Sequence, residues 1–393
     1  MDLSEFSAIC YRFWNQQFEM IQWLVDREQV VSDGTLLFPT IMICTGTEKH
    51  FLVELAGASR RFSTLVLKER KQHSTTEYLG QFPDDGPLEP IFLLNASETE
   101  ISRLCLSNDV DFEKAEKRFP ALSSYKSRLV RTNSNSSPIE FGPDFKDHTF
   151  SDCVFLNVRA EIYRVKHVVD LLIVDCKMSA SHLSTRLSNR VYGKPSAVGT
   201  ITVASAPEAE HRLIATQLQS LFLSPHLHET TIGEFFNSHP EIIARAFNAS
   251  RFVYEPHLLW IEAAEGNPDT AINPDLLFQR SDGFYDILDF KTALLDRGST
   301  TRGPRNRRMF IAAVNEGLAQ LANYAEYFNF EKNQLLALDK YEIQIDQPNL
   351  YLIVGNFDNT TAVEVEEAMR PFGKNIIVLD YDTVVQLYLK SSD

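Results

Sequence analysis

The sequence predicts a mixed α/β protein in two parts: an α+β amino-terminal region over residues 1–205 and an α/β domain over residues 206–393. Three observations support this. Short strand-like apolar runs fill much of the first part. The second part follows the order helix, three strands, helix, strand, with further elements after it. The composition, 44% hydrophobic and 23% charged, is that of an ordinary folded protein, and 393 residues suffice for two or three domains.

The amino-terminal region combines one helix with several strands. Phe6, Ile9, Phe13 and Phe18 fall near helical spacing and predict a helix over residues 5–27. Strand-like runs follow at 35–43, 51–55, 64–68 and 90–94, and later at 154–158, 161–166 and 168–174, a small sheet ending near residue 204. The polar stretch 131–138 predicts a linker or exposed loop, with an internal break near 131–145.

The second part opens with a helix over 206–222, because Ser205 supplies a cap residue and Glu208 an acid in the first turn. We therefore place the domain boundary near residue 206. Asp282-Gly283 predicts a hairpin turn. The expected elements are helices at 229–238, after Pro240, and at 309–328, 362–370 and 382–389, and strands at 252–262, 275–279, 284–291, 350–354 and 376–379.

The net charge of −15 argues against a protein that binds nucleic acid over its whole surface, since phosphate contacts come from Lys and Arg. Any DNA contact must be local. One basic segment, offset only by Asp296, offers such a patch. It carries Arg297, Arg302, Arg305, Arg307 and Arg308. A flexible, soluble loop is the alternative reading of this segment.

Targeting and metal-binding signals are absent from the sequence. No stretch of about 18 uninterrupted apolar residues occurs, and the amino terminus lacks the basic start of a secretion signal, so we expect a cytoplasmic protein without membrane contact. Neither the five cysteines nor the histidines have the spacing of a zinc site. The scattered histidines are His167, His211, His226 and His228.

Asp275, Asp289 and Lys291 are the candidate catalytic residues. Asp289 and Lys291 are two apart on one strand, so their side chains share a face while Phe290 points into the packing. The hairpin lets Asp275 reach that face from the neighbouring strand. Two carboxylates, the Phe290 carbonyl and water suit Mg²⁺, with Mn²⁺ as the alternative cation, and a lysine completes a phosphodiester-cleaving set. A solvated surface ion pair is the competing reading.

The tripeptide Asn-Pro-Asp occurs twice, ending at Asp269 and at Asp275. Asp275 leads directly into a strand that can pair with the one bearing Asp289, whereas Asp269 is followed by a predicted loop. We therefore assign Asp275 to the site and Asp269 to a turn.

With these residues identified, residues 206–393 resemble the PD-(D/E)XK nucleases, and more narrowly the carboxy-terminal nuclease domain of the Shedu anti-phage defence family. Aspartate at 289, where glutamate is commoner, and histidine at 239, in place of asparagine, are departures. The similar segments are ETTIGEFFNSHP at 229–240, Asn273-Pro274-Asp275-Leu276-Leu277, Asp289-Phe290-Lys291, Gln320-Leu321-Ala322-Asn323-Tyr324 and Tyr351-Leu352-Ile353-Val354-Gly355 with Tyr381-Asp382.

This resemblance implies a restriction-endonuclease-like core and adds two site residues. Glu229 becomes the acid of the first helix and a further metal ligand, and Gln320 completes the site from a later helix. Glu234 and Glu262 are weaker candidates for the role of Glu229. Packing or a helix-start acid are the plain alternatives for Gln320 and Glu229.

The expected function is therefore a Mg²⁺-dependent endonuclease that nicks or cleaves double-stranded DNA. The resemblance implies anti-phage defence, a homotetramer and an amino-terminal region that regulates the nuclease. Two alternatives stay open: a catalytically inactive nuclease fold that binds DNA or a partner, and a repair or restriction nuclease unrelated to defence. No P-loop sequence is present, so ATP-driven translocation by this chain is not expected.

Overall fold

A computed structural model describes residues 1–30, 35–71, 74–79, 92–95, 100–132, 139–159, 162–193, 201–202, 205–222, 228–264, 269–293, 298–356 and 359–390. The chain divides into two compact units. Unit 1 contains residues 1–110, 125–156 and 166–217, and unit 2 contains residues 111–124, 157–165 and 218–393. The division runs through the helix that the sequence analysis took as the start of the second part. It also assigns two earlier segments to unit 2.

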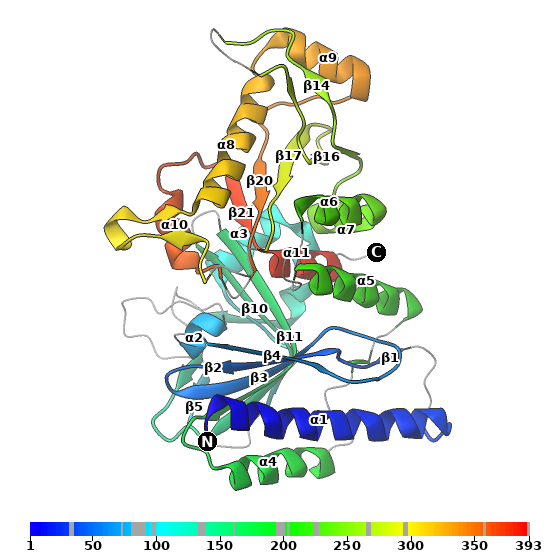
Figure 1. Cartoon of the computed structure of the whole chain (residues 1–393), viewed down its shortest axis with the longest axis vertical. Helices are drawn as coiled ribbons and strands as arrows, with labels where there is room; N and C mark the ends of the chain where they lie inside the picture. The colour runs from blue at the N-terminus through cyan, green and yellow to red at the C-terminus, as the bar shows by residue number, and fades with distance from the viewer. Residues whose placement is uncertain are drawn as a thin grey trace. The chain divides into compact units, whose positions relative to one another are not determined.

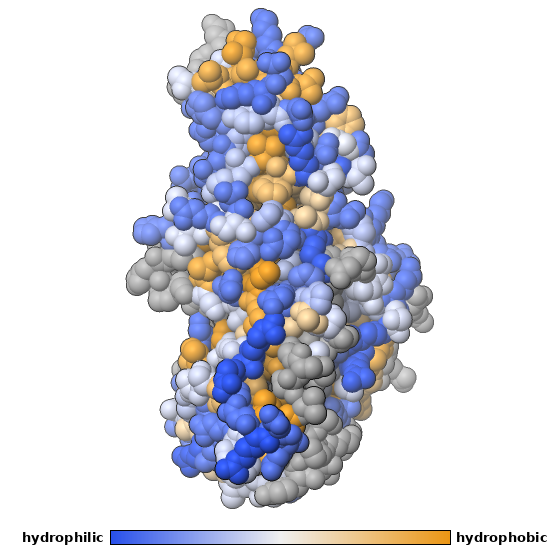
Figure 2. Space-filling view, turned by 90° about the vertical axis from the view of Figure 1, so that its right-hand side faces the viewer, coloured by the Kyte–Doolittle hydropathy of each residue, from blue (hydrophilic) through white to orange (hydrophobic). Residues whose placement is uncertain are grey.

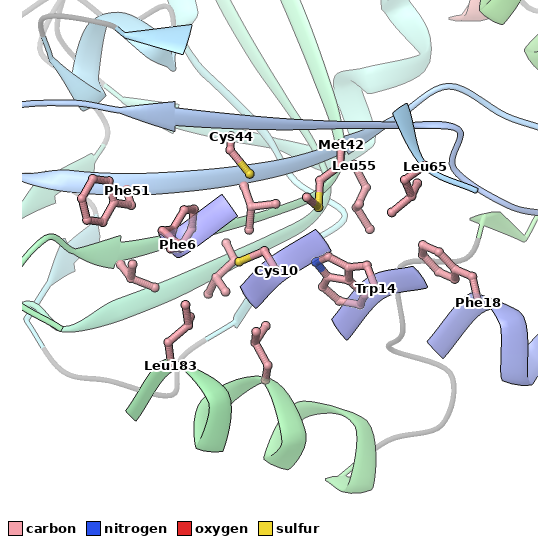
Figure 3. Close-up of a cluster of buried hydrophobic side chains, with 14 of the residues drawn as sticks. Phe6, Cys10, Trp14, Phe18, Met42, Cys44, Phe51, Leu55, Leu65 and Leu183 are labelled. Carbon is pink, nitrogen blue, oxygen red and sulfur yellow. The ribbon is translucent and has the colours of Figure 1, made fainter. Parts of the chain in front are cut away.

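Unit 1 packs a long helix on a sheet. Helix α1 (Leu3–Asp26) begins at Asp2, whose side chain accepts a hydrogen bond of 2.8 Å from the Glu5 amide. One face of α1, with Phe6, Cys10 and Trp14, is fully buried against the strands (Figure 3). The expected helix over 5–27 is present. The strand expected over 35–43 is divided into Leu36–Leu37 and Ile41–Gly46, and the runs expected at 161–166 and 168–174 form one strand, Ile162–Asp175.

The remaining elements of unit 1 are mostly strands. They are β1 (Leu36–Leu37), β2 (Ile41–Gly46), β3 (His50–Ala56), β4 (Val66–Lys71), α2 (Thr75–Tyr78), β5 (Phe92–Leu94), β6 (Glu100–Ser102), β7 (Cys105–Asn108), β8 (Leu129–Thr132), β9 (Ile139–Phe141), most of β10 (Asp147–Arg159) and β11 (Ile162–Asp175), α4 (Ala180–Gly193) and β12 (Ile201–Thr202). Most of the polar stretch predicted as a linker, residues 133–138, lies outside the described residues.

Unit 2 contains the helices and strands of the second part. Two helices cross the division, α3 (Asp109–Arg118) and α5 (Ala206–Phe222). The others are α6 (Glu229–Ser238), α7 (Pro240–Phe247), α8 (Ala312–Tyr327), α9 (Glu331–Tyr341), α10 (Ala362–Met369) and α11 (Tyr381–Lys390). The strands are β13 (Phe252–Tyr254), β14 (Leu258–Leu259), β15 (Ala271–Ile272), β16 (Leu276–Gln279), β17 (Tyr285–Phe290), β18 (Thr301–Arg302), β19 (Met309–Phe310), β20 (Leu350–Ile353) and β21 (Ile376–Leu379).

The sheet of unit 2 has the strand order β13-β16-β17-β20-β21, continued by the first residues of β11, where Ile162 pairs with Val378. β16 and β17 form the predicted antiparallel hairpin, with Gly283 at φ +91° in the turn. β17, β20 and β21 run parallel. Helix α8 runs along β17 and β20 (Figure 1). The carboxyl ends of β17 and β20 therefore meet at one edge of the sheet.

The mixed α/β class is confirmed, and the differences from the sequence prediction are local. The strand expected over 252–262 is broken into β13 and β14, because Glu255 adopts φ +42° and Pro256 follows it. Helices α2, α3, α4 and α9 were not predicted. In the described part of the chain, no helix has both the length and the apolar character needed to cross a membrane.

Candidate active site

The β16–β17 hairpin carries the two candidate aspartates. Leu276 pairs with Leu288 in antiparallel register, so the next residues, Asp275 and Asp289, face each other across the two strands. Every residue of β17 is buried, and Asp289 is only 1% exposed. Unpaired charge is costly in such a strand, so the surface ion-pair reading does not fit Asp289.

Lys291 contacts two carboxylates, and a third lies beside one of them. Its Nζ lies 2.9 Å from Asp289 Oδ2 and 3.5 Å from Glu229 Oε2, a side chain that comes from the first turn of α6. Asp275 Oδ2 accepts a hydrogen bond of 2.7 Å from the Phe290 amide. The structure therefore brings Glu229, Asp275, Asp289 and Lys291 together. We call these four residues the acidic cluster.

Burial disfavours the charged forms of the two aspartates in the acidic cluster. Burial raises the pKa of Asp289 to about 7, and the neighbouring Asp275 carboxylate adds to that increase. Burial also raises the pKa of Asp275, although the Phe290 amide and Lys291 partly oppose the rise. For Lys291, burial acts to lower the pKa, but Asp289 and then Glu229 raise it overall. The lysine is therefore the charged counter-ion of the cluster.

Neighbouring residues fix the position of Lys291. The Tyr381 hydroxyl, fully buried, donates a hydrogen bond of 2.6 Å to the Lys291 carbonyl. A Cβ at Gly317 of α8 would lie 3.0 Å from Lys291 Cε, so glycine allows the helix to approach the lysine closely. Phe290, between the two charged residues, is buried and stacks on Phe236 of α6 with ring centroids 4.5 Å apart.

Helix α8 turns a stripe of residues toward the acidic cluster. Gly317, Gln320 and Tyr324 are spaced three and four apart and so share one helix face. Gly317 contacts Lys291, and the carboxylates of Asp289 and Asp275 contribute to the raised pKa of Tyr324. Within the described residues, the buried Oε1 of Gln320 has no hydrogen-bond partner. A buried acceptor without a hydrogen-bond partner favours a role for Gln320 in the site over simple packing.

The donor set suits a hard divalent cation. Glu229, Asp275 and Asp289 offer carboxylate oxygens, and Gln320 Oε1, on the helix face that carries Gly317, is a buried oxygen without a hydrogen-bond partner among the described residues. Among the described residues, no group of three or more His, Cys, Asp or Glu side chains already has the arrangement of a metal site. Lys291 is instead the counter-ion of the cluster. The residues have the oxygen donors that Mg²⁺ prefers. Binding of the ion would require their oxygens to converge further.

The competing acids lie in other surroundings. Asp269 Oδ2 accepts a hydrogen bond of 2.8 Å from Asn323, outside any strand. Glu262 lies 3.9 Å from Lys332, and its backbone contacts Asn333 of α9. Glu234 follows Glu229 on α6 but makes no described ion pair with Lys291. Contact with Lys291 therefore distinguishes Glu229 from the other two glutamates.

The predicted basic patch is only partly free. Arg297 lies outside the described residues. Arg305 Nε lies 3.2 Å from Glu367, and Arg308 Nη1 lies 3.0 Å from Glu364, both glutamates being on α10. Arg302 and Arg307 are exposed. Sequence reasoning did not foresee this pairing, since the acids come more than fifty residues later with no local signal linking them to the arginines.

Two residues that support the site were missed as functional positions. Tyr381 belongs to the last segment similar to the nuclease family, and Phe222, which ends the helix predicted over 206–222, stacks on it with ring centroids 5.6 Å apart. Tyr381 supports the main chain of Lys291 and Phe222 packs on Tyr381, contacts that no sequence pattern reveals. In comparisons with known proteins, no family model and no curated protein matches this chain.

Proposed function

We propose that unit 2 hydrolyses phosphodiester bonds of double-stranded DNA with Mg²⁺, as an endonuclease of the PD-(D/E)XK type. The single observation that carries the proposal is the pairing of Lys291 with Asp289 and Glu229, with Asp275 opposite Asp289, at the carboxyl end of a buried central strand. Ligands of open α/β sheets bind at such ends. Two largely buried aspartates beside one lysine are costly for a merely structural site and useful for holding a cation.

Each residue then has a distinct part in the reaction. Mg²⁺ would lower the pKa of a bound water and offset negative charge on the phosphate. Asp275 and Asp289 would hold the ion, with Glu229 and the Phe290 carbonyl as further oxygen donors. Lys291 would orient the attacking water or stabilise the charged phosphate. Gln320 would accept a hydrogen bond from the attacking or a metal-bound water.

The resemblance to the Shedu family extends the proposal to anti-phage defence in the cytoplasm, with unit 1 and neighbouring amino-terminal segments governing when the nuclease acts. A repair or restriction role uses the same chemistry. Cleavage assays on linear and circular DNA, together with phage infection of cells that express the protein, distinguish these roles. Protection of cells from phage supports defence, and unchanged infection leaves repair or restriction.

The direct test is Mg²⁺-dependent cleavage of linear and circular DNA by the wild type beside Lys291→Ala and Asp275→Ala. Loss of a metal-coordinating acid or the lysine should reduce cleavage by a factor of about 100 or more. Asp269→Ala is the matched control, because it changes the same tripeptide outside the site and should cleave normally. Equal cleavage by all four proteins would refute the assignment.

A nuclease fold that only binds DNA or a partner gives a different result in the same assay. It retains DNA affinity with no turnover in Mg²⁺ or Mn²⁺. Single-turnover conditions with excess protein separate this outcome from slow cleavage.

We also propose that the chain assembles with further copies of itself, as the resemblance implies for a tetramer. Exposed apolar side chains gather at the end of unit 2 formed by α9 and β14 (Figure 2). In an antiparallel pair of α9 helices, Glu331 would face Lys340 of the other copy. Leu335→Glu should then reduce the mass measured by sedimentation velocity. The apolar residues are Leu259, Ile261, Leu335 and Leu338.

A further inference from the structure

The basic loop at residues 298–311 is attached to the same sheet edge as Lys291. It forms a small hairpin, β18 with β19, and a helical turn at Arg305–Arg307. The Thr300 amide donates to the Asn359 carbonyl at 2.8 Å, and the Asn359 side chain donates to the Ala293 carbonyl at 2.7 Å. Ala293 follows Lys291 by two residues. The loop is therefore held beside the acidic cluster.

Helix α10 fixes one side of this loop with one buried and one partly buried acid. Glu367 is only 7% exposed, and its carboxylate lies 3.5 Å from Arg308 Nε. Glu364 pairs with Arg308 and also accepts hydrogen bonds from the hydroxyls of Ser299 and Thr301, at 3.0 and 2.5 Å. Contacts on both sides of the hairpin mean that the loop has a set conformation, not that of a flexible excursion.

The charges of the loop are only half neutralised. Glu364 and Glu367 oppose four arginines at positions 302, 305, 307 and 308. Arg302 and Arg307 are exposed, and within the described residues neither makes an ion pair. Two positive charges therefore extend from a rigid loop next to the acidic cluster, in a chain of net charge −15. A local cationic surface of this kind attracts a polyanion.

We propose that Arg302 and Arg307 contact backbone phosphates of the DNA strand flanking the cleaved bond, and that Arg308, Glu364 and Glu367 are positioning residues that hold them there. This proposal rests on the proposed function, since it takes DNA as the substrate. Guanidinium groups bind phosphate by paired hydrogen bonds, and such contacts set the register of the duplex without reading its sequence.

Binding of a short fluorescein-labelled duplex by the full chain in EDTA tests the proposal without cleavage. Fluorescence anisotropy over a series of salt concentrations gives the slope of log affinity against log salt. Arg302→Gln and Arg307→Gln should each make this slope shallower by about one unit, and the double variant by about two. Lys332→Gln, an exposed lysine of α9, is the matched control and should leave the slope unchanged.

Glu367→Gln tests the positioning role. The change adds one net positive charge, so charge alone predicts tighter DNA binding. Loss of the anchor predicts weaker binding, because the loop must then be ordered on the DNA. Tighter or equal binding would overturn the positioning role. Thermal melting of the variant identifies a global folding defect, and Glu364→Gln then gives the same test from a less buried position.

The two proposals fail in different ways. Unchanged salt slopes in Arg302→Gln and Arg307→Gln, with Mg²⁺-dependent cleavage intact, would overturn the phosphate contacts and leave the nuclease. Shallower slopes without any cleavage would keep the contacts and remove the nuclease. A wild-type chain with no DNA affinity at low salt would overturn both.

Discussion

Buried acids are arranged in opposite ways in unit 1 and in the acidic cluster of unit 2. In unit 1 each has its own cation: Glu54 lies 2.9 Å from Lys166, and Asp170 is held by both terminal nitrogens of Arg190. In unit 2 Asp289 and Glu229 share Lys291, and Asp275 lies opposite Asp289 on the paired strand. The matched pairs hold neighbouring elements together. The unmatched cluster stores unfavourable charge that a bound cation would relieve, and this difference separates structural from functional acids.

The largest effect should come from breaking a matched pair. Lys166→Met leaves Glu54 buried without its main counter-ion. The Tyr78 hydroxyl supplies only a hydrogen bond, and the charge of Arg70 lowers the pKa of Glu54 less than the charge of Lys166 does. We expect a loss of about 3 to 5 kcal/mol in the free energy of unfolding of unit 1. Urea denaturation measures it. Lys146→Met, at an exposed position, is the control and should change stability by less than about 0.5 kcal/mol.

Acid should weaken unit 1 through two buried histidines. Burial lowers the pKa of both His50 and His148 to about 4, from 6.5. Below pH 6.5 both histidines bind protons in the unfolded chain but not in the folded unit. Their contribution to the free energy of unfolding is therefore complete above pH 6.5 and is lost as the pH falls toward 4. The loss should be roughly 2 to 3 kcal/mol for each histidine. A urea midpoint for unit 1 that stays constant over this range would contradict the prediction, and His50→Gln should remove half of the loss.

Removing an acid from the unmatched cluster should have the opposite sign. The folded pKa of Asp289 is raised to about 7, so its favourable contribution is complete below pH 4 and is lost as the pH rises through 7. Asp289→Asn should therefore stabilise the metal-free protein by about 1 to 2 kcal/mol near pH 8 and by almost nothing near pH 4. Urea denaturation in EDTA at the two pH values measures this. Destabilisation at both would show that Asp289 is a structural acid.

The smallest effect should come from the main-chain support of Lys291. Tyr381→Phe removes the hydrogen bond to the Lys291 carbonyl and should lower stability by about 1 kcal/mol while slowing cleavage severalfold. Tyr285→Phe is the control, because the buried Tyr285 hydroxyl has no hydrogen-bond partner among the described residues. Similar losses in both variants would mean that the Tyr381 hydroxyl has no special role.

Local patterns were sufficient for most elements of unit 2. Helix α5 starts where Ser205 caps it, and the hairpin turn occurs at Asp282-Gly283, because both signals act over a few residues. Helix α9 was missed for a physical reason. Its buried residues are Asn333 and Ala337, while Leu335 and Leu338 are exposed, so no apolar stripe marks its inner face.

Long-range ion pairs explain other omissions. Helix α4 is rich in serine and weakly apolar, and it is held on its unit by Arg186 and Arg190 through Asp147 and Asp170. No residue pattern within α4 indicates those partners. The neutralisation of Arg308 by α10 was invisible for the same reason.

In the candidate site, too, the residues placed by local spacing could be predicted and the one placed by a long-range contact could not. Asp275, Asp289 and Lys291 follow from two adjacent strands, so spacing alone placed them on one face. Glu229 lies sixty-two residues before Lys291, and only a family resemblance proposed their proximity. The acidic cluster is therefore predictable where it depends on strand geometry, and not where it depends on helix packing.

Direct measurement of cation binding tests the central claim, that the acidic cluster holds a divalent metal ion. Titration of the intact chain with Mn²⁺, followed by electron paramagnetic resonance, reports binding without DNA or cleavage. We expect a Mn²⁺ site that is lost in Asp275→Asn and Asp289→Asn and kept in Asp269→Asn. Equal Mn²⁺ binding by the wild type and all three variants would contradict it.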